Sequence, residues 1–130
     1  MNISDESEDK IEDGLHEAQK LIHAWNRHVG WWDDCDTDAT VEARVPEKLC
    51  LIHSEVSEAM EAHRKGLMDD KLKERPGIEV ELADAIIRIL DLGGALHLDL
   101  AGAVVEKFSY NRTRSDHKRA NRAKQGGKRY

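Results

Sequence analysis

The stretch of sequence that decides the fold runs from Ile78 to His97 and reads IEVELADAIIRILDLGGALH. On a helix, with about 100° between successive residues, its apolar side chains cover nearly the whole circumference. Such a pattern is typical of a central helix that is buried on most sides. Glu81 and Asp84 stand three residues apart at the border of the apolar surface, so both carboxylates project from one side of this helix.

The preceding apolar stretch, from about Glu47 to Lys65, carries the same acidic spacing at Glu55 and Glu58. Apolar residues lie on both sides of Glu55, where a carboxylate is costly unless it is paired or binds a metal. Four carboxylates on two helices can converge on a hard cation, Mg²⁺ or Mn²⁺, which prefers oxygen ligands and keeps several waters. A metal with bound water indicates phosphate chemistry. The alternative is that both pairs are ordinary solvated helix faces, because 35% of the residues are charged.

The N-terminal part of the chain predicts one more helix, followed by a loop. Apolar residues keep helical spacing from Ile11 to about Val29, and Gly30 is a suitable C-terminal signal. Trp25 fits the apolar stripe, which places it in the core. We expect a loop from Trp31 to Pro46, because the segment is rich in Asp and Thr and ends at a proline.

The C-terminal part predicts a fourth helix over residues 100–120, with Asp99 as its N-cap. Residues 1–10 are expected to form a flexible acidic N-terminus and residues 121–130 a flexible basic tail. The sequence has no repeat and no long alternation of apolar and polar residues. The predicted fold class is therefore all-α, a compact four-helix bundle over residues 11–120.

Charge is distributed unevenly along the chain. The formal net charge is −6, yet nine of the 20 Lys and Arg residues lie in residues 107–130. A basic C-terminal segment attracts phosphate, so a non-catalytic module that binds a nucleotide or a nucleic acid through this segment is the alternative function. The sequence contains two cysteines without zinc spacing, no signal peptide and no apolar run of membrane-spanning length. These features favour a cytoplasmic protein without a membrane partner.

Two familiar metal motifs are excluded by their own spacing. If Asp34 opened a calcium-binding EF-hand loop, its sixth and twelfth positions would be Ala39 and Val45, where the motif needs Gly and Glu. A carboxylate-bridged di-iron bundle needs Glu-x-x-His on two helices, and no such pair occurs in the sequence.

Two further groups of residues are suited to bind a nucleotide. Lys107, Asn111 and Arg114 recur at i, i+4 and i+7, so they share one helix face and offer donors to phosphate or sugar oxygens. The alternative is a solvated basic face. Trp31 and Trp32 stand at a helix end beside a loop, where an indole ring can stack on a base.

Several motifs of the sequence resemble those of a known family. The signature Glu55-Val-Ser-Glu58, followed after 22 residues by Glu81-Leu-Ala-Asp84, is similar to that of the MazG-like superfamily of all-α nucleoside triphosphate pyrophosphohydrolases. The resemblance is closest to small phage- and prophage-type members. Lys107-x-x-x-Asn111-Arg112-x-Arg114 resembles the Lys…Asn element of the family, and Gly126-Gly127-Lys128 resembles its small-phage-type tail. His23 and Trp32 stand nine residues apart, similar to the residues that flank the base in dCTP-hydrolysing relatives.

The resemblance implies a function and a set of site residues. Glu55, Glu58, Glu81 and Asp84 would bind Mg²⁺, with Mn²⁺ as a possible substitute, and would catalyse conversion of a (d)NTP to a (d)NMP and pyrophosphate. One of the four, Glu58 for example, would serve as general base. Lys107, Asn111, Arg114 and Arg88 would bind phosphates or sugar, although Arg88 could instead orient Asp84, and His23 and Trp32 would bind the base. The family also implies a homodimer or a dimer of dimers.

Overall fold

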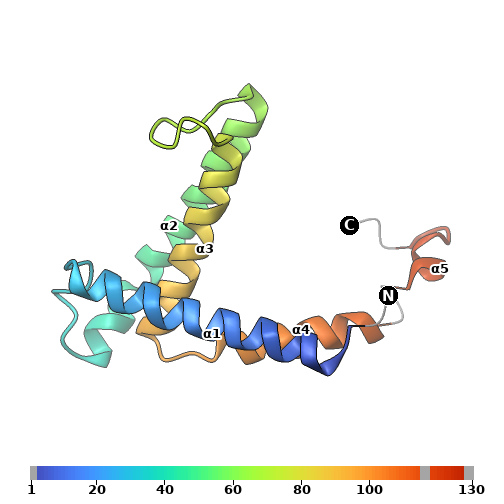
Figure 1. The fold of residues 1–130 in the computed structure, drawn as a ribbon, viewed down its shortest axis with the longest axis horizontal. Helices are drawn as coiled ribbons and strands as arrows, with labels where there is room; N and C mark the ends of the chain where they lie inside the picture. Colours follow the sequence, from blue (N-terminus) through green and yellow to red (C-terminus); the bar gives the residue numbers. More distant parts are fainter. Residues whose placement is uncertain (1–2, 115–117, 128–130) are drawn as a thin grey trace. The chain divides into compact units, whose positions relative to one another are not determined.

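The computed structural model describes residues 3–114 and 118–127, and within them it is all-helical. The helices are α1 (Asp5–His28), α2 (Asp38–Lys65), α3 (Gly77–Ala95), α4 (Leu100–Thr113) and the short α5 (Arg119–Arg122) (Figure 1). One isolated antiparallel bridge joins Met68 to Pro76. The prediction of an all-α protein is confirmed. Within the described ranges, no helix is long and apolar enough to cross a membrane.

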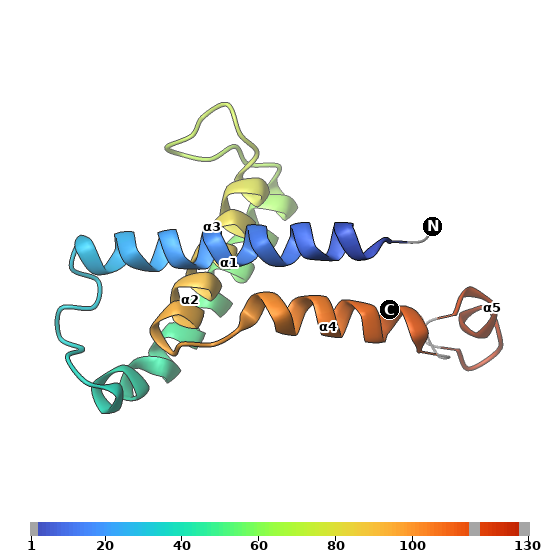
Figure 2. The ribbon, with the colours of Figure 1, turned by 60° about the horizontal axis from the view of Figure 1, so that its bottom comes forward.

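The chain divides into two compact units. Unit 1 consists of residues 1–16 and 99–130, and unit 2 consists of residues 17–98. α1 contributes its first turns to unit 1 and its remaining turns to unit 2. Within unit 1, Arg112 of α4 donates a hydrogen bond to Glu8 of α1, and the two segments run alongside each other (Figure 2).

The predicted end of the second helix at Lys65 and the predicted N-cap at Asp99 are both confirmed. α2 ends at Gly66, which adopts the left-handed conformation with φ of 62° and donates its N–H to the carbonyls of Ala62 and His63. α4 begins after Asp99, whose side chain accepts a hydrogen bond from the Gly102 N–H at 2.9 Å. The local chemistry of these residues therefore sets both ends.

The predicted loop from Trp31 to Pro46 is wrong in its second half. α2 begins at Asp38 because Thr37 and Thr40 form a capping box, in which the Thr40 N–H donates to Thr37 Oγ1 and the Thr37 N–H to Thr40 Oγ1. Pro46 lies inside the helix, where it removes one backbone hydrogen bond. The first turns of α2 gain burial in return, since Val41 is only 7% exposed.

Three other expected boundaries change. α1 begins at Asp5 rather than at Ile11, and three acids in its first turn complement the helix dipole. α3 ends at Ala95 rather than at His97. The fourth predicted helix ends at Thr113, and α5 follows separately. Residues 115–117 of that predicted helix and residues 128–130 of the predicted tail, including Lys128, lie outside the described residues.

Unit 2 holds the main core. Trp32, Cys35, Val41, Leu92 and Ala95 form one buried cluster, so the loop after α1 and the start of α2 pack on the end of α3. Gly94 lets α3 approach α1 closely, because a Cβ at this position would lie 2.5 Å from His23 Cβ. Trp25 was expected in this core, and this expectation is wrong, since 63% of its surface is exposed.

α2 and α3 pack side by side as an antiparallel pair (Figure 1). Small residues allow their close approach: Ala59, Ala62 and Ala85 are all buried. A neighbouring side of α3 remains largely exposed, because Leu82, Ile86 and Ile89 are between 42% and 55% exposed. The expectation that this helix is buried on most sides is therefore wrong for the single chain.

Candidate metal centre

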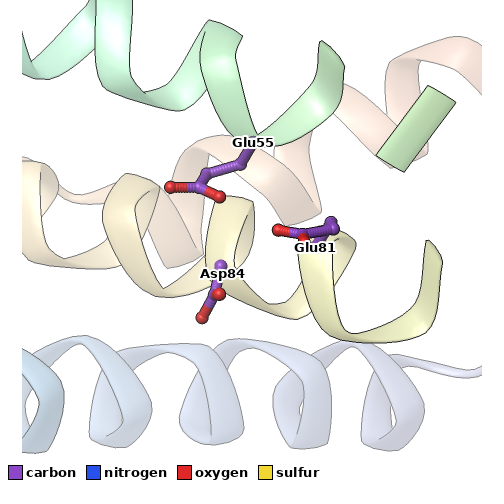
Figure 3. Close-up of side chains that lie close together, drawn as sticks. All are labelled: Glu55, Glu81 and Asp84. Carbon is purple, nitrogen blue, oxygen red and sulfur yellow. The ribbon is translucent and has the colours of Figure 1, made fainter. Parts of the chain in front are cut away.

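Three of the four predicted metal ligands converge. Glu55 extends from α2 toward Glu81 and Asp84 on α3 (Figure 3). One carboxylate oxygen of each of the three lies within 4.8 Å of the others. Glu55 is 6% exposed, and Glu81 and Asp84 are half-buried. The helix pair therefore presents an oxygen-rich group that is partly exposed at Glu81 and Asp84.

Glu58, the fourth predicted ligand, is exposed and is not a member of this group of three. It lies three residues after Glu55 on α2, and its negative charge contributes to raising the pKa of Glu81. Glu58 is therefore close enough to Glu81 to act on that carboxylate through its charge.

Burial and negative charge disfavour ionisation at this site. Burial is the largest cause that raises the pKa of Glu81, from an ordinary value of 4.5 to about 7. The charge of Glu58, a hydrogen bond with Glu55 and the charges of Glu55 and Asp84 act in the same direction. Burial and the charge of Glu55 also raise the pKa of Asp84, against the opposing charge of Arg88. The carboxylates outnumber the single positive charge of Arg88, and a cation would supply more positive charge.

Arg88 partly compensates Glu55. Its Nε donates a hydrogen bond to Glu55 Oε1 at 2.5 Å, and Arg88 is half-buried. Arg88 was predicted either to bind phosphate or to orient Asp84, and the carboxylate that it contacts is Glu55. A guanidinium bound to the most buried acid of the group offsets part of the cost of burying that carboxylate.

The three carboxylates fit a hard divalent cation. Mg²⁺ is commonly held by a few carboxylates while water completes its coordination, and the partial exposure of Glu81 and Asp84 is compatible with bound water. The donor set contains only oxygen, which favours Mg²⁺ or Mn²⁺ over zinc or copper. To ligate with both oxygens, Glu55 would have to share or release Arg88.

His23 and Trp32, the predicted base-binding pair, are both bound to Asp91 of α3. The Trp32 Nε1–H donates to the two Asp91 carboxylate oxygens at 3.1 Å each, and His23 Nδ1 lies 2.8 Å from Asp91 Oδ1. Trp32 is 2% exposed, and Asp91 is 6% exposed. Lys48 Nζ lies 4.4 Å from the centroid of the Trp32 ring. This arrangement is a satisfied polar network within the core.

The predicted phosphate-binding residues of the C-terminal part belong to unit 1, whereas the acidic group belongs to unit 2. Lys107 and Arg114 lie over the same ring, with Lys107 Nζ at 5.0 Å and the Arg114 guanidinium carbon at 5.8 Å from the Tyr110 centroid. The Oδ1 atom of Asn111 is buried, and no hydrogen-bond partner is found for it within the described chain. Their role in binding phosphate stays a prediction.

A cavity of about 210 Å³ adjoins the acidic group in unit 2. Asp84 and Arg88 form part of its wall, and the remainder comes from residues of α1, the following loop, α2 and α3: Asn26, Trp31, Lys48, Ile87 and Asp91. The cavity therefore lies beside the carboxylates on the side of Asp84.

Sequence reasoning missed Asn26, Lys48 and Asp91 as residues of this region. Asp91 carried a detectable signal, because it follows Asp84 by seven residues and so lies on the same helix face. Asn26 and Lys48 carried none, since single polar residues on helices are usually solvated. In comparisons of the chain with protein-family models, with curated proteins and with solved structures, no match is found.

Proposed function

We propose that the protein is a Mg²⁺-dependent nucleoside triphosphate pyrophosphohydrolase of the MazG-like type, which converts a (d)NTP to a (d)NMP and pyrophosphate. The observation that carries the proposal is the convergence of Glu55, Glu81 and Asp84, whose ligand atoms lie within 4.8 Å of one another on two packed helices. The pKa of Glu81, raised to about 7, supports a site that gains from a cation.

In this proposal the three carboxylates hold the metal. A bound Mg²⁺ would neutralise phosphate charge and acidify a water. Glu58, which is exposed beside the group, would accept the proton of the attacking water. Oxygen adds to phosphorus, the α–β phosphoanhydride bond breaks, and pyrophosphate leaves. Arg88, when it releases Glu55, supplies a guanidinium for phosphate oxygens.

We also propose that two copies associate through α2 and α3. Leu49, Val56 and Met60 recur at i, i+7 and i+11 on α2 and are between 47% and 59% exposed. The exposed stripe of Leu82, Ile86 and Ile89 runs along α3. Apolar surface of this extent on two adjacent helices marks an interface, and a second copy carries the matching stripe. Such a pairing would complete the bundle that one chain leaves open.

The test is a hydrolysis panel with the eight common NTPs and dNTPs, with and without Mg²⁺, in which pyrophosphate and phosphate are measured separately. We expect Mg²⁺-dependent release of pyrophosphate. Glu55→Gln and Glu81→Gln should abolish it, and Glu58→Gln should lower kcat by a factor of about 10² to 10⁴, as for loss of a general base.

Glu61→Gln is the matched control. Glu61 lies one turn further along α2, and its carboxylate pairs with Lys65 Nζ at 2.5 Å rather than with the acidic group. This variant should keep wild-type turnover. Absence of pyrophosphate release from every nucleotide by folded wild-type protein would contradict the proposal, as would full activity of Glu55→Gln.

A further inference from the structure

The residues that line the cavity beside the acidic group suit a flat, uncharged ring. Trp31 contributes an indole that is 65% exposed, and Ile87 contributes an apolar surface. Lys48 and Arg88 place two positive charges in the wall, and Asp84 and Asp91 place two negative ones. These formal charges balance, so the cavity as a whole does not favour an anion such as a phosphate chain.

Asn26 supplies the polar group that such a ring needs. Its side chain is half-buried in the cavity wall, and within the described residues its amide makes no hydrogen bond. The amide offers both a donor and an acceptor, the combination that matches an edge of a nucleobase on which donor and acceptor stand side by side. Asp91, in contrast, already accepts from Trp32 and contacts His23.

We infer that this cavity binds the nucleobase of the substrate, with Trp31 stacking on the ring and Asn26 hydrogen-bonding to its edge. The inference rests on the proposed function. It assigns base recognition to Asn26 and Trp31 in place of His23 and Trp32, because Asp91 holds that pair and Lys48 lies over the Trp32 ring. Asp91 then acts as a positioning residue, because it holds His23 and Trp32 beside the cavity.

The position of the cavity fits this assignment. Asp84 belongs to the acidic group, and Arg88 is bound to Glu55 of that group. Both residues also line the cavity, so the two sites are continuous. A nucleotide whose phosphates lie at the carboxylates can place its base in the neighbouring space. Stacking on an exposed indole is tolerant of base identity, whereas hydrogen bonds to Asn26 discriminate between bases.

The test separates the base from the phosphates. Binding of nucleosides, of Mg²⁺–pyrophosphate and of each (d)NMP is measured by calorimetry for wild type, Trp31→Ala, Trp31→Phe and Asn26→Ala. We expect Trp31→Ala to weaken nucleoside and (d)NMP binding by about tenfold or more, the usual effect of removing a stacking ring. Trp31→Phe should retain most of the affinity. Asn26→Ala should reduce the differences among bases, and pyrophosphate binding should not change in any variant.

Trp25→Ala is the control, because Trp25 is similarly exposed, at 63%, but does not line the cavity. Equal nucleoside binding by Trp31→Ala and Trp25→Ala overturns the inference, as does a wild-type protein that binds no nucleoside or (d)NMP. Because these measurements need no turnover, they are independent of the hydrolysis panel. Base binding that depends on Trp31 in a protein without hydrolysis would contradict only the proposed function.

Discussion

Glu81 keeps its proton up to about pH 7 because burial and the charges of Glu58, Glu55 and Asp84 disfavour its ionised form. A divalent cation at this group must displace that proton. Below pH 7 the metal therefore competes with a bound proton, and above pH 7 it does not. The affinity for Mg²⁺ should accordingly rise as the pH rises through about 7.

This linkage predicts a measurable release of protons. Calorimetric titration with Mg²⁺ at about pH 6, in buffers of different ionisation enthalpy, should show close to one proton released per ion, and little at about pH 8. In Glu81→Gln, any remaining Mg²⁺ binding should release much less at pH 6. The same proton count at both pH values would show that Glu81 does not ligate the metal.

Asp91 is a second residue whose surroundings make a clear prediction. Asp91→Ala would leave the Trp32 Nε1–H without its buried acceptor and would remove the partner of His23 Nδ1. We expect the free energy of unfolding in urea to fall by about 2 to 4 kcal/mol, because buried polar groups lose their partner. Asp91→Asn keeps one acceptor oxygen and should lower the free energy of unfolding by a smaller amount.

The control for Asp91 is Asp70→Ala. Asp70 is exposed and forms an ion pair with its exposed neighbour Lys71, so its loss should change stability by no more than about 0.5 kcal/mol. Equal effects of the two substitutions would mean that the network around Asp91 contributes nothing to stability.

At the level of the helices, the start of α2 depends on one cap. The Thr40 N–H donates to Thr37 Oγ1 at 3.2 Å, and this cap sets the first turns that bring Val41 into the core. Thr37→Ala should lower the free energy of unfolding by about 1 kcal/mol. Ser57→Ala is the control in the middle of α2, where the hydroxyl only donates to the His53 carbonyl, and it should be nearly neutral. Similar losses in both variants would contradict the role of the cap.

The whole molecule leaves α2 and α3 with exposed apolar stripes, and self-association is the expected consequence. Ile86 is 55% exposed on α3. Ile86→Glu should shift the protein toward the monomer in sedimentation velocity, because a charge would be buried in the interface. Leu72→Glu, at 54% exposure in the turn between α2 and α3, should leave the mass unchanged. A monomeric wild-type protein would contradict the pairing.

The sequence by itself determined the helical class, the end of α2 at Gly66, the cap at Asp99 and the acidic spacings on two neighbouring helices. These are local properties: periodicity, φ at a glycine, and the reach of a side chain over three residues. The sequence also placed Glu55, Glu81 and Asp84 as candidates, because an acid at an apolar border is recognisable from spacing alone.

Only the tertiary structure decided which of these residues meet and what surrounds them. The pairing of Arg88 with Glu55, the bonds of His23 and Trp32 to Asp91 and the cavity at Asn26 join residues between 33 and 68 positions apart or from three different helices. Pro46 also could not be placed correctly from the sequence. A proline disfavours the interior of a helix, yet Pro46 lies inside α2, where the burial of Val41 outweighs that local preference. Packing depends on residues that are distant in the sequence, and a local sequence pattern does not show which of them come together.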